Sequence, residues 1–472
     1  MSAPTRDVVV IGAGSAGSVV AARLAADPSC AVTVIETGTH PPAGTRSAAR
    51  LPLGERSTVV QRYPSRLTAA PPRWTQLVRG CTVGGSGAVN GGYFCRAMPA
   101  DFDTGWPPGW AWPQALEHFR ALEDDRDFAG PAHGHDGPIV VARSSDFVGA
   151  TEAFVAAARH AGFRWIPDLN DAGHDLPDGV GAVPLNILQG NRSDPGTAFL
   201  QPVAGQPNVT VMTETTAVRL QIAAGRVVGV DIVGPDGPST IYADRIVLCA
   251  GAIGTAQLLM LSGIGDEGLL GRLGIPLVQP LPVGLNCVDH PEWLFAVEWP
   301  AVSGHPPLEV VLTTADGLEI RPYTTGFRSM VGESTGGQDD PVHIGVALMR
   351  PRRRVLVTLD SADPSIAPRI EQDYDREPAD VADLERGALL VDELVGAAGS
   401  SPVWATSQHL CGSAPMGQVI DERCRVHGVD GLWVIDGAAL PVIPRRGPHA
   451  TIAMLAHRAA EFVGDGSAQR TR

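Results

Sequence analysis

A glycine-rich turn between two apolar segments lies close to the N-terminus and limits the folds open to this chain. Residues 7–38 read DVVVIGAGSAGSVVAARLAADPSCAVTVIETG, which predicts a strand, a tight turn, a helix and a second strand. Gly12 allows the turn, Gly14 lets the backbone approach a pyrophosphate, and Gly17 permits close packing of the helix on the strand. Glu36 ends the second strand, where its carboxylate can accept hydrogen bonds from a ribose. The segment therefore predicts a dinucleotide-binding βαβ unit. We expect an α/β domain with a parallel sheet, within a chain whose fold class is α+β overall.

The length of the chain and its later apolar segments indicate two domains. The chain has 472 residues, which exceeds the usual size of one domain, so two closely packed domains are expected. Two further segments, RIVLCAGAIG and GLWVIDG, each predict a buried strand that returns to the first sheet. We expect a discontinuous cofactor-binding domain of residues 1–130, 201–290 and 405–472. Residues 131–200 and 291–404 would form a substrate domain whose strands make a mixed sheet over the cofactor.

Composition narrows the classes of function. The formal net charge is −15 and the sequence contains no lysine, which disfavours nucleic-acid binding because phosphates need a basic face. No apolar run approaches 18 residues, so we expect no transmembrane segment. The apolar start is too short and too rich in glycine for a signal peptide, and we expect a cytoplasmic protein, with peripheral attachment to the inner face of the membrane as the alternative. The seven cysteines are scattered without a C-x-x-C pair, so we expect neither a disulfide framework nor a metal site.

A second glycine-rich segment follows at residues 79–103, RGCTVGGSGAVNGGYFCRAMPADFD. Five glycines lie between Gly84 and Gly92, with Ser86 and Asn90 among them. Such a segment can bring backbone N–H groups and two small polar side chains against a flat ligand with little steric cost. The valine and tyrosine within it favour a buried loop over a flexible surface loop.

These segments resemble the glucose–methanol–choline (GMC) oxidoreductases, a family of FAD-dependent enzymes that oxidise alcohols. Residues 79–103 resemble the first signature of the family, although Cys81 replaces its usual basic residue or asparagine. The segment GAIGTAQLLMLSGIG at 251–265 resembles the second signature, with Ala256 in place of a proline. PVGLNCVDHP at 282–291 is similar to the family's Val-Gly-x-Asn-x-x-Asp-His stretch. The resemblance implies the GMC fold, in which a Rossmann-like FAD-binding domain carries a mixed-sheet substrate domain, and FAD as the cofactor.

Seven short segments are expected to hold the FAD, from the fingerprint and the resemblance together. They are Gly12, Gly14, Ser15, Ala16 and Gly17; Glu36 and Thr37; Gly84, Gly85, Ser86, Asn90, Gly91 and Tyr93; Ala217 and Val218; Ala250 and Gly251; Asp436 and Gly437; and Ala450 and Thr451. Some relatives attach FAD through a histidine, but none lies between residues 80 and 105, and Val89 occupies one such position. We therefore expect noncovalent FAD, with a thioether to Cys81 or Cys95 as the alternative.

Two histidines near the C-terminus are the candidate catalytic residues. SQHLCGSAPMG resembles the stretch that carries the family's first active-site histidine, and His409 lies at that position; His449 lies where relatives have a second histidine or an asparagine. Hydride leaves an alcohol carbon easily only if the hydroxyl proton also leaves, so an imidazole must lie within hydrogen-bond reach. We expect His409 to be the base and His449 to bind the substrate oxygen or share the proton. The helix beginning near Ala450 would direct its N-terminal amides at the negative edge of reduced flavin.

The resulting function is oxidation of a CH–OH group with FAD. The short length and the segments GGSGAVNGGYFCR, GWAW, HGHDGPI and DHPEW resemble the mycofactocin-system branch of the family. That resemblance implies reduced mycofactocin, a peptide-derived redox cofactor, as the substrate and a respiratory electron acceptor. Three alternatives remain: an oxidase or dehydrogenase of a small alcohol, a hydroxynitrile-type lyase that keeps FAD without net redox chemistry, and a nicotinamide-dependent dehydrogenase. The second glycine-rich segment and the two histidines disfavour the last of these.

Overall fold

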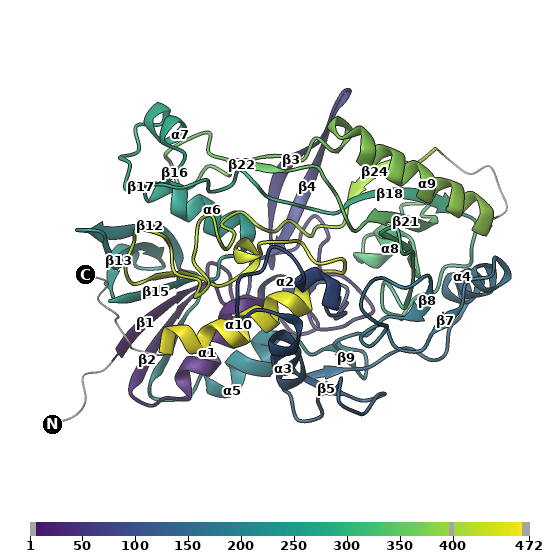
Figure 1. Ribbon diagram of the computed structural model, residues 1–472, viewed down its shortest axis with the longest axis horizontal. Helices are drawn as coiled ribbons and strands as arrows, with labels where there is room; N and C mark the ends of the chain where they lie inside the picture. The colour runs from purple at the N-terminus through teal and green to yellow at the C-terminus, as the bar shows by residue number, and fades with distance from the viewer. Residues whose placement is uncertain (1–5, 396–400, 465–472) are drawn as a thin grey trace.

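The computed structural model describes residues 6–395 and 401–464, and a five-stranded parallel sheet forms one end of the molecule (Figure 1). The strand order is β11-β2-β1-β15-β25, and all neighbours run parallel. The strands are β1 (Arg6–Ile11), β2 (Cys30–Ile35), β11 (Val209–Met212), β15 (Arg245–Leu248) and β25 (Leu432–Val434). The two later apolar segments therefore return to the sheet begun at residue 6, as the sequence predicts.

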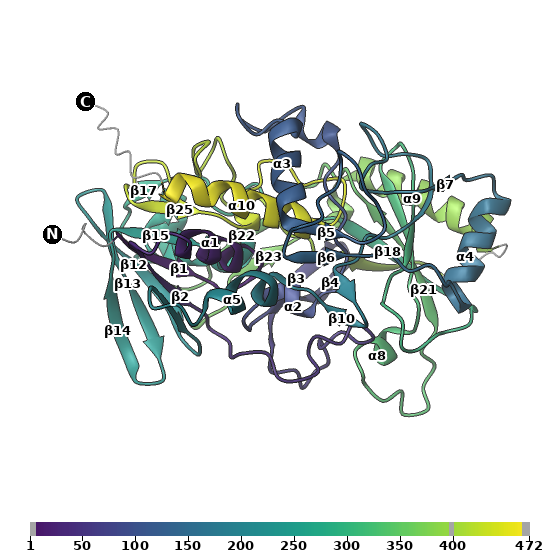
Figure 2. The same cartoon turned by 90° about the horizontal axis from the view of Figure 1, so that it is seen from below.

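Helices cover this sheet because its central strands are apolar along their whole length. Residues 8–11 of β1 and 246–248 of β15 are at most 4% exposed, which is typical of parallel strands buried on both faces. Helices α1 (Ser15–Ala25) and α10 (His449–Gly464) pack together (Figures 1 and 2). Helix α6 (Gly251–Leu261) lies on the opposite side of the sheet (Figure 1). A meander of β12 (Thr216–Ala223), β13 (Arg226–Gly234) and β14 (Gly237–Tyr242) lies beyond β15.

A seven-stranded mixed sheet forms the other end of the molecule, with the order β24-β18-β21-β20-β19-β8-β7. Only β7 and β8 are parallel neighbours in it. Helices α4 (Gly149–His160) and α9 (Pro378–Val395) pack on this sheet. Its strands are β7 (Trp165–Ile166), β8 (Gly179–Ala182), β18 (Pro291–Val297), β19 (Val310–Thr313), β20 (Leu318–Pro322), β21 (Val342–Leu348) and β24 (Val403–Thr406). The predicted fold class, a Rossmann-like domain with a mixed-sheet second domain, is confirmed.

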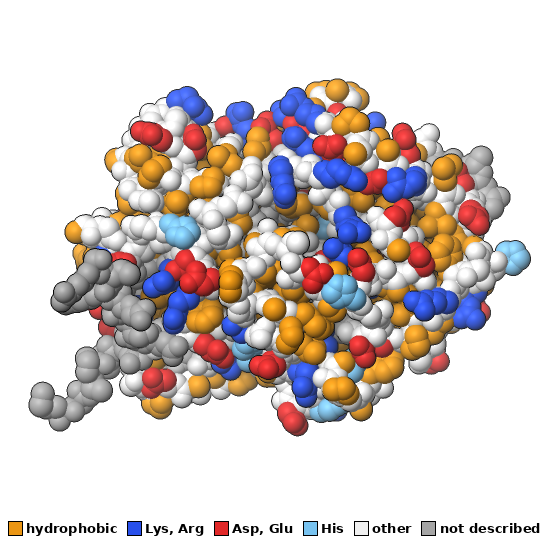
Figure 3. Space-filling view, in the orientation of Figure 1, with side chains coloured by type: hydrophobic (Ala, Val, Ile, Leu, Met, Phe, Trp, Pro, Cys, Tyr) orange, Lys and Arg blue, Asp and Glu red, His pale blue; other side chains and the backbone are white. Residues whose placement is uncertain are grey.

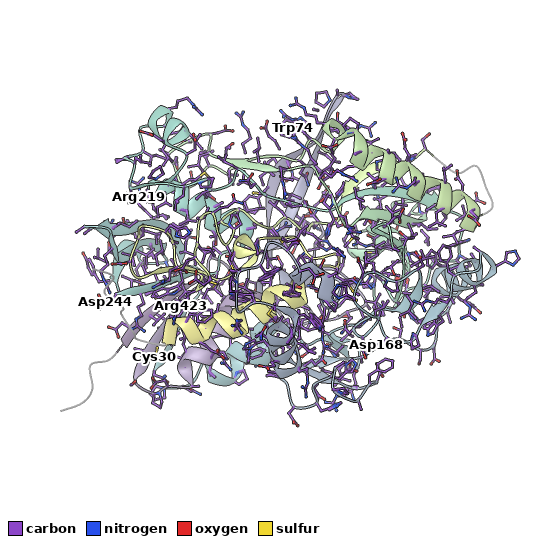
Figure 4. The ribbon with its side chains drawn as sticks, in the orientation of Figure 1. Cys30, Trp74, Asp168, Arg219, Asp244 and Arg423 are labelled. Carbon is purple, nitrogen blue, oxygen red and sulfur yellow. The ribbon has the colours of Figure 1, made fainter. Side chains whose placement is uncertain are left out.

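A four-stranded sheet connects the two ends. Its order is β22-β23-β3-β4, where β3 (Val60–Ala69) and β4 (Pro72–Gly80) form a long hairpin. The other two strands, β22 (Leu356–Thr358) and β23 (Arg369–Glu371), come from the segment assigned to the substrate domain. Trp74, near the tip of the hairpin, is 64% exposed (Figure 4). The division into two domains stays a prediction, and residues 1–5, 396–400 and 465–472 of it lie outside the described residues.

Short elements complete the fold. They are α2 (Gly85–Val89), η1 (Pro99–Phe102), α3 (Trp112–Leu122), β5 (Glu123–Asp125), β6 (Ile139–Val141), β9 (Ile187–Leu188), β10 (Asn191–Arg192), η2 (Gly196–Leu200), α5 (Gln201–Val203), β16 (Ile264–Gly265), α7 (Glu267–Arg272), β17 (Gln279–Pro280), α8 (Phe327–Met330), η3 (Tyr374–Arg376) and η4 (Gly437–Ala439). Among the described helices, none combines the length and the apolar character needed to cross a bilayer. The seven cysteines all lie in the described part of the chain, and none of them forms a disulfide there. Basic and acidic side chains are both scattered among hydrophobic ones over the face drawn in Figure 3.

A buried cluster of charges holds the loops around β5 and β6. His133 contacts Asp125 through Nδ1 at 3.1 Å and Asp168 through Nε2 at 2.9 Å. Arg143 donates to the same two carboxylates at 2.9 and 2.8 Å, and Arg96 pairs with Glu123. Glu123, Asp125 and His133 are residue types that bind metals, and their ligand atoms lie within 4.8 Å of one another. The two guanidinium groups and a protonated His133 balance the three carboxylates, which makes this an ion-pair cluster.

We expect His133 to stabilise the fold mainly below pH 11. Its close contacts with the carboxylates of Asp125, Asp168 and Glu123 raise its pKa to about 11, so the folded protein holds this proton more tightly than the unfolded chain. That stabilisation is complete below the ordinary histidine pKa and is lost as the pH rises toward 11. His133→Gln should lower the free energy of unfolding by about 3 kcal/mol at pH 7, and the difference from the natural protein should shrink toward pH 10.

Denaturant unfolding between pH 6 and 10 measures this difference. His174→Gln is the matched control, because His174 pairs with Asp103 at 2.9 Å but its side chain is 67% exposed. An exposed pair contributes less than about 1 kcal/mol. A pH-independent difference for His133→Gln, or an equal loss in the control, would contradict the assignment.

Candidate active site

A cavity of about 700 Å³ lies between the parallel sheet and the mixed sheet. It runs from the carboxyl ends of β1 and β2 to side chains of β18 and β20. Both candidate histidines line it. The predicted FAD contacts that also line it are Gly12, Gly14, Ser15, Ala16, Glu36, Thr37, Gly85, Ser86, Asn90, Gly91, Tyr93, Ala217, Ala250, Gly251, Asp436 and Gly437. The remaining predicted contacts do not line it: Gly17, Gly84, Val218, Ala450 and Thr451.

The first glycine turn has the backbone that its sequence predicts. Gly12 has a φ of +102°, and a Cβ there would lie 2.4 Å from the carbonyl oxygen of Cys249. Gly17 is excluded from the cavity because it serves packing: its Cβ would lie 1.8 Å from the carbonyl oxygen of Gly12. Helix α1 begins after Gly14, and no side chain of the described chain caps it. Its first N–H groups are therefore available to an anion such as a pyrophosphate.

Glu36 has a structural task in addition to its predicted one. Its Oε2 accepts a hydrogen bond from the Ala13 N–H and its Oε1 accepts one from the Gly38 N–H, both at 2.9 Å. The carboxylate thereby ties the glycine turn to the end of β2. Burial raises the pKa of Glu36. The fingerprint predicts where this carboxylate lies, but its two backbone partners become apparent only in the folded chain.

The second glycine segment packs directly on the first. A Cβ on Gly85 would lie 2.6 Å from Cα of Gly14, so the two turns approach each other closely. Side chains added at Gly91 or Gly251, which also line the cavity, would meet no atom within 4 Å. The backbone is thus packed tightly where the two glycine turns meet, and the cavity is open beside Gly91 and Gly251. A close approach to the backbone at such a turn suits a pyrophosphate.

His449 is held by side chains from both glycine segments. Oδ1 of Asn90 accepts a hydrogen bond from the Gly92 N–H at 2.9 Å, which directs the Nδ2 of Asn90 at Nδ1 of His449, 3.2 Å away. Nδ1 therefore accepts, and Nε2 carries the proton and faces Oγ of Ser15 at 3.0 Å. Burial lowers the pKa of His449 to about 4, so the ring is neutral. A Cβ on Gly87 would lie 3.0 Å from Nε2, which explains a glycine that sequence reasoning left without a role.

The backbone and Nδ1 of His409 have hydrogen-bond partners, and its Nε2 is open to the cavity. Its main-chain N–H donates to Oδ1 of Asp289 at 2.7 Å, and its Nδ1 lies 2.9 Å from Nδ1 of His290. Its Nε2 has no hydrogen-bond partner among residues 6–395 and 401–464, and a Cβ on Gly447 would lie 3.5 Å from it. Burial, and then the neighbouring His290, lower the pKa of His409 well below its ordinary value. The ring is therefore neutral and presents one free nitrogen to the cavity.

The residue before His409 has a strained backbone. Gln408 has a φ of +64°, which is uncommon for a residue with a side chain. Its Oε1 accepts a hydrogen bond from the Val78 N–H at 2.9 Å, and its Nε2 donates to the carbonyl oxygen of Gln76 at 3.1 Å. The edge of β4 thus fixes the conformation that places His409. Nothing in the sequence motif indicates this contact.

Asp436 acts through the backbone of two helices. Its Oδ1 accepts a hydrogen bond from the Ala438 N–H at 2.7 Å, and its Oδ2 accepts from the Gly251 N–H at 2.8 Å and from Thr255 Oγ1 at 2.6 Å. Burial raises its pKa to about 6. Asp436 therefore anchors the starts of α6 and η4 at the wall of the cavity, and its predicted contact with FAD stays a prediction.

Sequence reasoning missed a charged group at the far end of the cavity. Arg321 donates to Glu319 at 2.8 Å and to Glu292 at 3.2 Å, and Arg446 donates to Glu319 at 3.2 Å. All four side chains are at most 6% exposed. The hydroxyl groups of Tyr93 and Tyr323 donate to Glu319 and Glu292, each at 2.8 Å. The strand register of the mixed sheet brings these residues together. No local sequence pattern predicts this charged group.

The fold, the paired glycine turns and the two neutral histidines define a dinucleotide-dependent oxidoreductase with an enclosed redox site. Residues 6–292 match one GMC oxidoreductase family model and residues 351–456 match a second. A GMC-type oxidoreductase in the thcA 5' region of Rhodococcus erythropolis is 39% identical over 501 residues, which cover 97% of this chain and 98% of that protein. The chain belongs to the GMC oxidoreductase family.

Two other relatives differ in substrate. An oxygen-dependent choline dehydrogenase of Brucella anthropi is 28% identical over 532 residues, which cover 97% of this chain and 95% of that protein. The crystal structure of pyridoxine 4-oxidase from Mesorbium loti matches with a TM-score of 0.88 at 25% identity and covers 97% of this chain and 98% of that chain. The predicted FAD cofactor and the predicted class of enzyme, an FAD-dependent oxidoreductase, are confirmed. The alternative of a nicotinamide-dependent dehydrogenase is wrong.

We expect the FAD to be bound without a covalent link. Burial raises the pKa of Cys81 to about 11 and that of Cys95 to about 12, so neither thiol is a ready nucleophile. Val89, in α2, offers no group for attachment. Acid precipitation of the purified yellow protein should release all of the flavin into the supernatant as intact FAD, measured by absorbance and mass spectrometry. Yellow colour that stays in the washed pellet would contradict this expectation.

Proposed function

We propose that the protein oxidises a CH–OH group with FAD and that His409 is the base. One observation carries the proposal: His409 is neutral, is fixed at its backbone and at Nδ1, and presents its free Nε2 to the cavity. The C–H and O–H bonds of the substrate break and a C=O bond forms. The hydroxyl proton goes to Nε2 of His409. FAD, when bound, supplies the hydride acceptor.

His449 has a smaller part in this proposal. Both of its ring nitrogens have partners within the protein, namely Asn90 and Ser15. A substrate oxygen would have to replace one of them to bind the ring. We therefore propose that His449 chiefly shapes the site between the glycine segments, and that the amides at the start of α10, near Ala450, stabilise negative charge on the reduced flavin.

The charges at the far end of the cavity favour an uncharged substrate. Glu292 and Glu319 each pair with a guanidinium group, and their carboxylates also accept hydrogen bonds from Tyr323 and Tyr93. Arg79, which also lines the cavity, lies close to the opposite charge of Asp289. Among the described residues at this end of the cavity, no carboxylate remains to compensate the charge of a quaternary ammonium group, and burying an uncompensated charge is unfavourable. We propose a neutral alcohol as the substrate class.

The resemblance to the mycofactocin-system branch supports a narrower proposal. Reduced mycofactocin would be the physiological alcohol, with electrons passing to a respiratory acceptor and the protein located in the cytoplasm or at the inner face of the membrane. The alternative of a hydroxynitrile-type lyase predicts no bleaching of the flavin by any alcohol. Anaerobic flavin reduction therefore separates the proposed oxidation from lyase chemistry.

A pair of alcohols of the same shape tests the substrate class. 3,3-Dimethylbutan-1-ol is the neutral counterpart of choline, and we expect it to reduce the flavin at least about tenfold faster at equal concentration, since it buries no charge. Pyridoxine and a reduced mycofactocin preparation extend the series. Anaerobic stopped-flow absorbance measures the rates. Faster reduction by choline would contradict a neutral substrate, and a failure of every alcohol would contradict the proposed oxidation.

The two histidines should have unequal effects. His409→Ala should keep FAD bound but lower the rate constant of flavin reduction by roughly two to four orders of magnitude, the usual contribution of a general base. His449→Asn keeps a hydrogen-bonding group between Ser15 and Asn90, so its loss should be smaller. Stopped-flow reduction, with flavin content checked by absorbance, measures both. If His449→Asn lost more of the rate than His409→Ala at equal flavin content, the assignment of His409 as the base would be wrong.

A further inference from the structure

His290, the second residue of the DHPEW segment, lies next to the proposed base, His409, on the side of its Nδ1. Nδ1 of His290 is 2.9 Å from Nδ1 of His409, and the two rings are nearly perpendicular, at 87°. His290 is fully buried. Two nitrogens at this distance share one proton, so one ring donates and the other accepts. Which ring donates decides whether Nε2 of His409 carries a lone pair or a proton.

We propose that His290 is a positioning residue that fixes the tautomer of His409 in which Nε2 is free to act as a base. The proposal rests on the proposed function, in which His409 receives the proton of the alcohol. His290 does not touch the substrate in this proposal. It acts by accepting the Nδ1–H of His409.

The proposed function sets the direction of the hydrogen bond. A neutral imidazole carries one ring proton, so if Nε2 of His409 accepts the hydroxyl proton, that ring proton lies on Nδ1. The partner of this Nδ1 in the described chain is Nδ1 of His290, 2.9 Å away. Nδ1 of His290 is then the acceptor and His409 the donor. The opposite arrangement would put a proton on Nε2 of His409 and leave the ring unable to accept one from the substrate.

The charged groups around the pair keep both rings neutral. Burial and the charge of Arg321 lower the pKa of His290, and burial, His290, Arg321 and Arg79 lower that of His409. Asp289 is adjacent, but its oxygens accept the main-chain N–H groups of both histidines and two side chains, and neither oxygen pairs with a ring in the described chain. A neutral imidazole therefore stands where many catalytic histidines have a carboxylate. It orients the base without raising its pKa.

A similar histidine pair, with arginine neighbours, occurs a second time, away from the cavity. Nδ1 of His118 lies 2.9 Å from Nδ1 of His457, with ring centroids 5.2 Å apart, as for His290 and His409. His457 is 8% exposed and belongs to α10. Removing one member of this pair measures the structural cost of losing such a contact without touching the base.

Substitutions at His290 test the proposal in the FAD-loaded enzyme. His290→Leu removes the acceptor, and we expect flavin reduction to slow by roughly ten- to thousandfold at unchanged flavin content and unchanged substrate KM, since a wrong tautomer disables the base. His290→Asn keeps an acceptor oxygen near the position of Nδ1 and should restore the rate to within about fivefold. His457→Leu should leave the rate unchanged. In a His409→Ala background, His290→Leu should have no further effect, which a general structural defect would not reproduce.

A second measurement does not depend on activity. In ¹⁵N-histidine-labelled protein, Nε2 of His409, assigned by its loss in His409→Ala, should show the shift of an unprotonated nitrogen, and this shift should move toward a mixture of tautomers in His290→Leu. A protonated Nε2 in the natural enzyme would overturn the proposal, as would equal rates and shifts in His290→Leu. If His290→Leu does not fold, a slow His290→Asn enzyme with an unchanged His409 shift would overturn it as well. Failure of the oxidation itself would show as no bleaching by any alcohol, whatever the tautomer.

Discussion

The buried carboxylate of Asp289 ties the mixed sheet to the four-stranded sheet beside the cavity. Asp289 is 1% exposed and directly precedes His290 and β18. Its Oδ1 accepts hydrogen bonds from the main-chain N–H groups of His290 and His409, at 2.9 and 2.7 Å. Its Oδ2 accepts from Gln372 and Thr406, at 2.9 and 2.8 Å. One carboxylate thus joins three segments distant in sequence, and because a buried carboxylate needs such partners, each segment constrains the others.

The parts of the site that could be predicted from sequence are those where a local backbone requirement selects the residue. Gly12 and Gly17 are recognisable because only glycine fits their turn and their packing, and Glu36 because it ends the strand that follows. The resemblance located His409 through its motif. The pairing of His290 with His409 was not predictable, because it joins residues 119 positions apart and depends on how two segments meet at Asp289. The contact of β23 with β3 is equally invisible locally and links segments assigned to different domains.

The net charge of the whole molecule is strongly negative, whereas the charged groups at the far end of its cavity are balanced. The chain carries a net charge of −15, yet Glu292 and Glu319 at the far end of the cavity are matched by guanidinium groups. Every basic residue is an arginine, whose planar fork can bind two carboxylates at once, as Arg321 does. A lysine could provide the charge but not this fork of two fixed donor directions. The composition therefore suits a cavity wall that is polar and rigid but electrically neutral.

The two histidines show how the same side chain is given different work by its neighbours. His449 has a partner on each ring nitrogen, so its tautomer and its orientation are both fixed. His409 has a partner on one nitrogen only, and that partner is neutral. A negatively charged partner would raise the pKa of His409 toward the range where the ring is protonated before substrate arrives. The difference between the two residues thus lies in what contacts Nε2 and in the charge of the group behind Nδ1, and the fold sets both through contacts with distant segments.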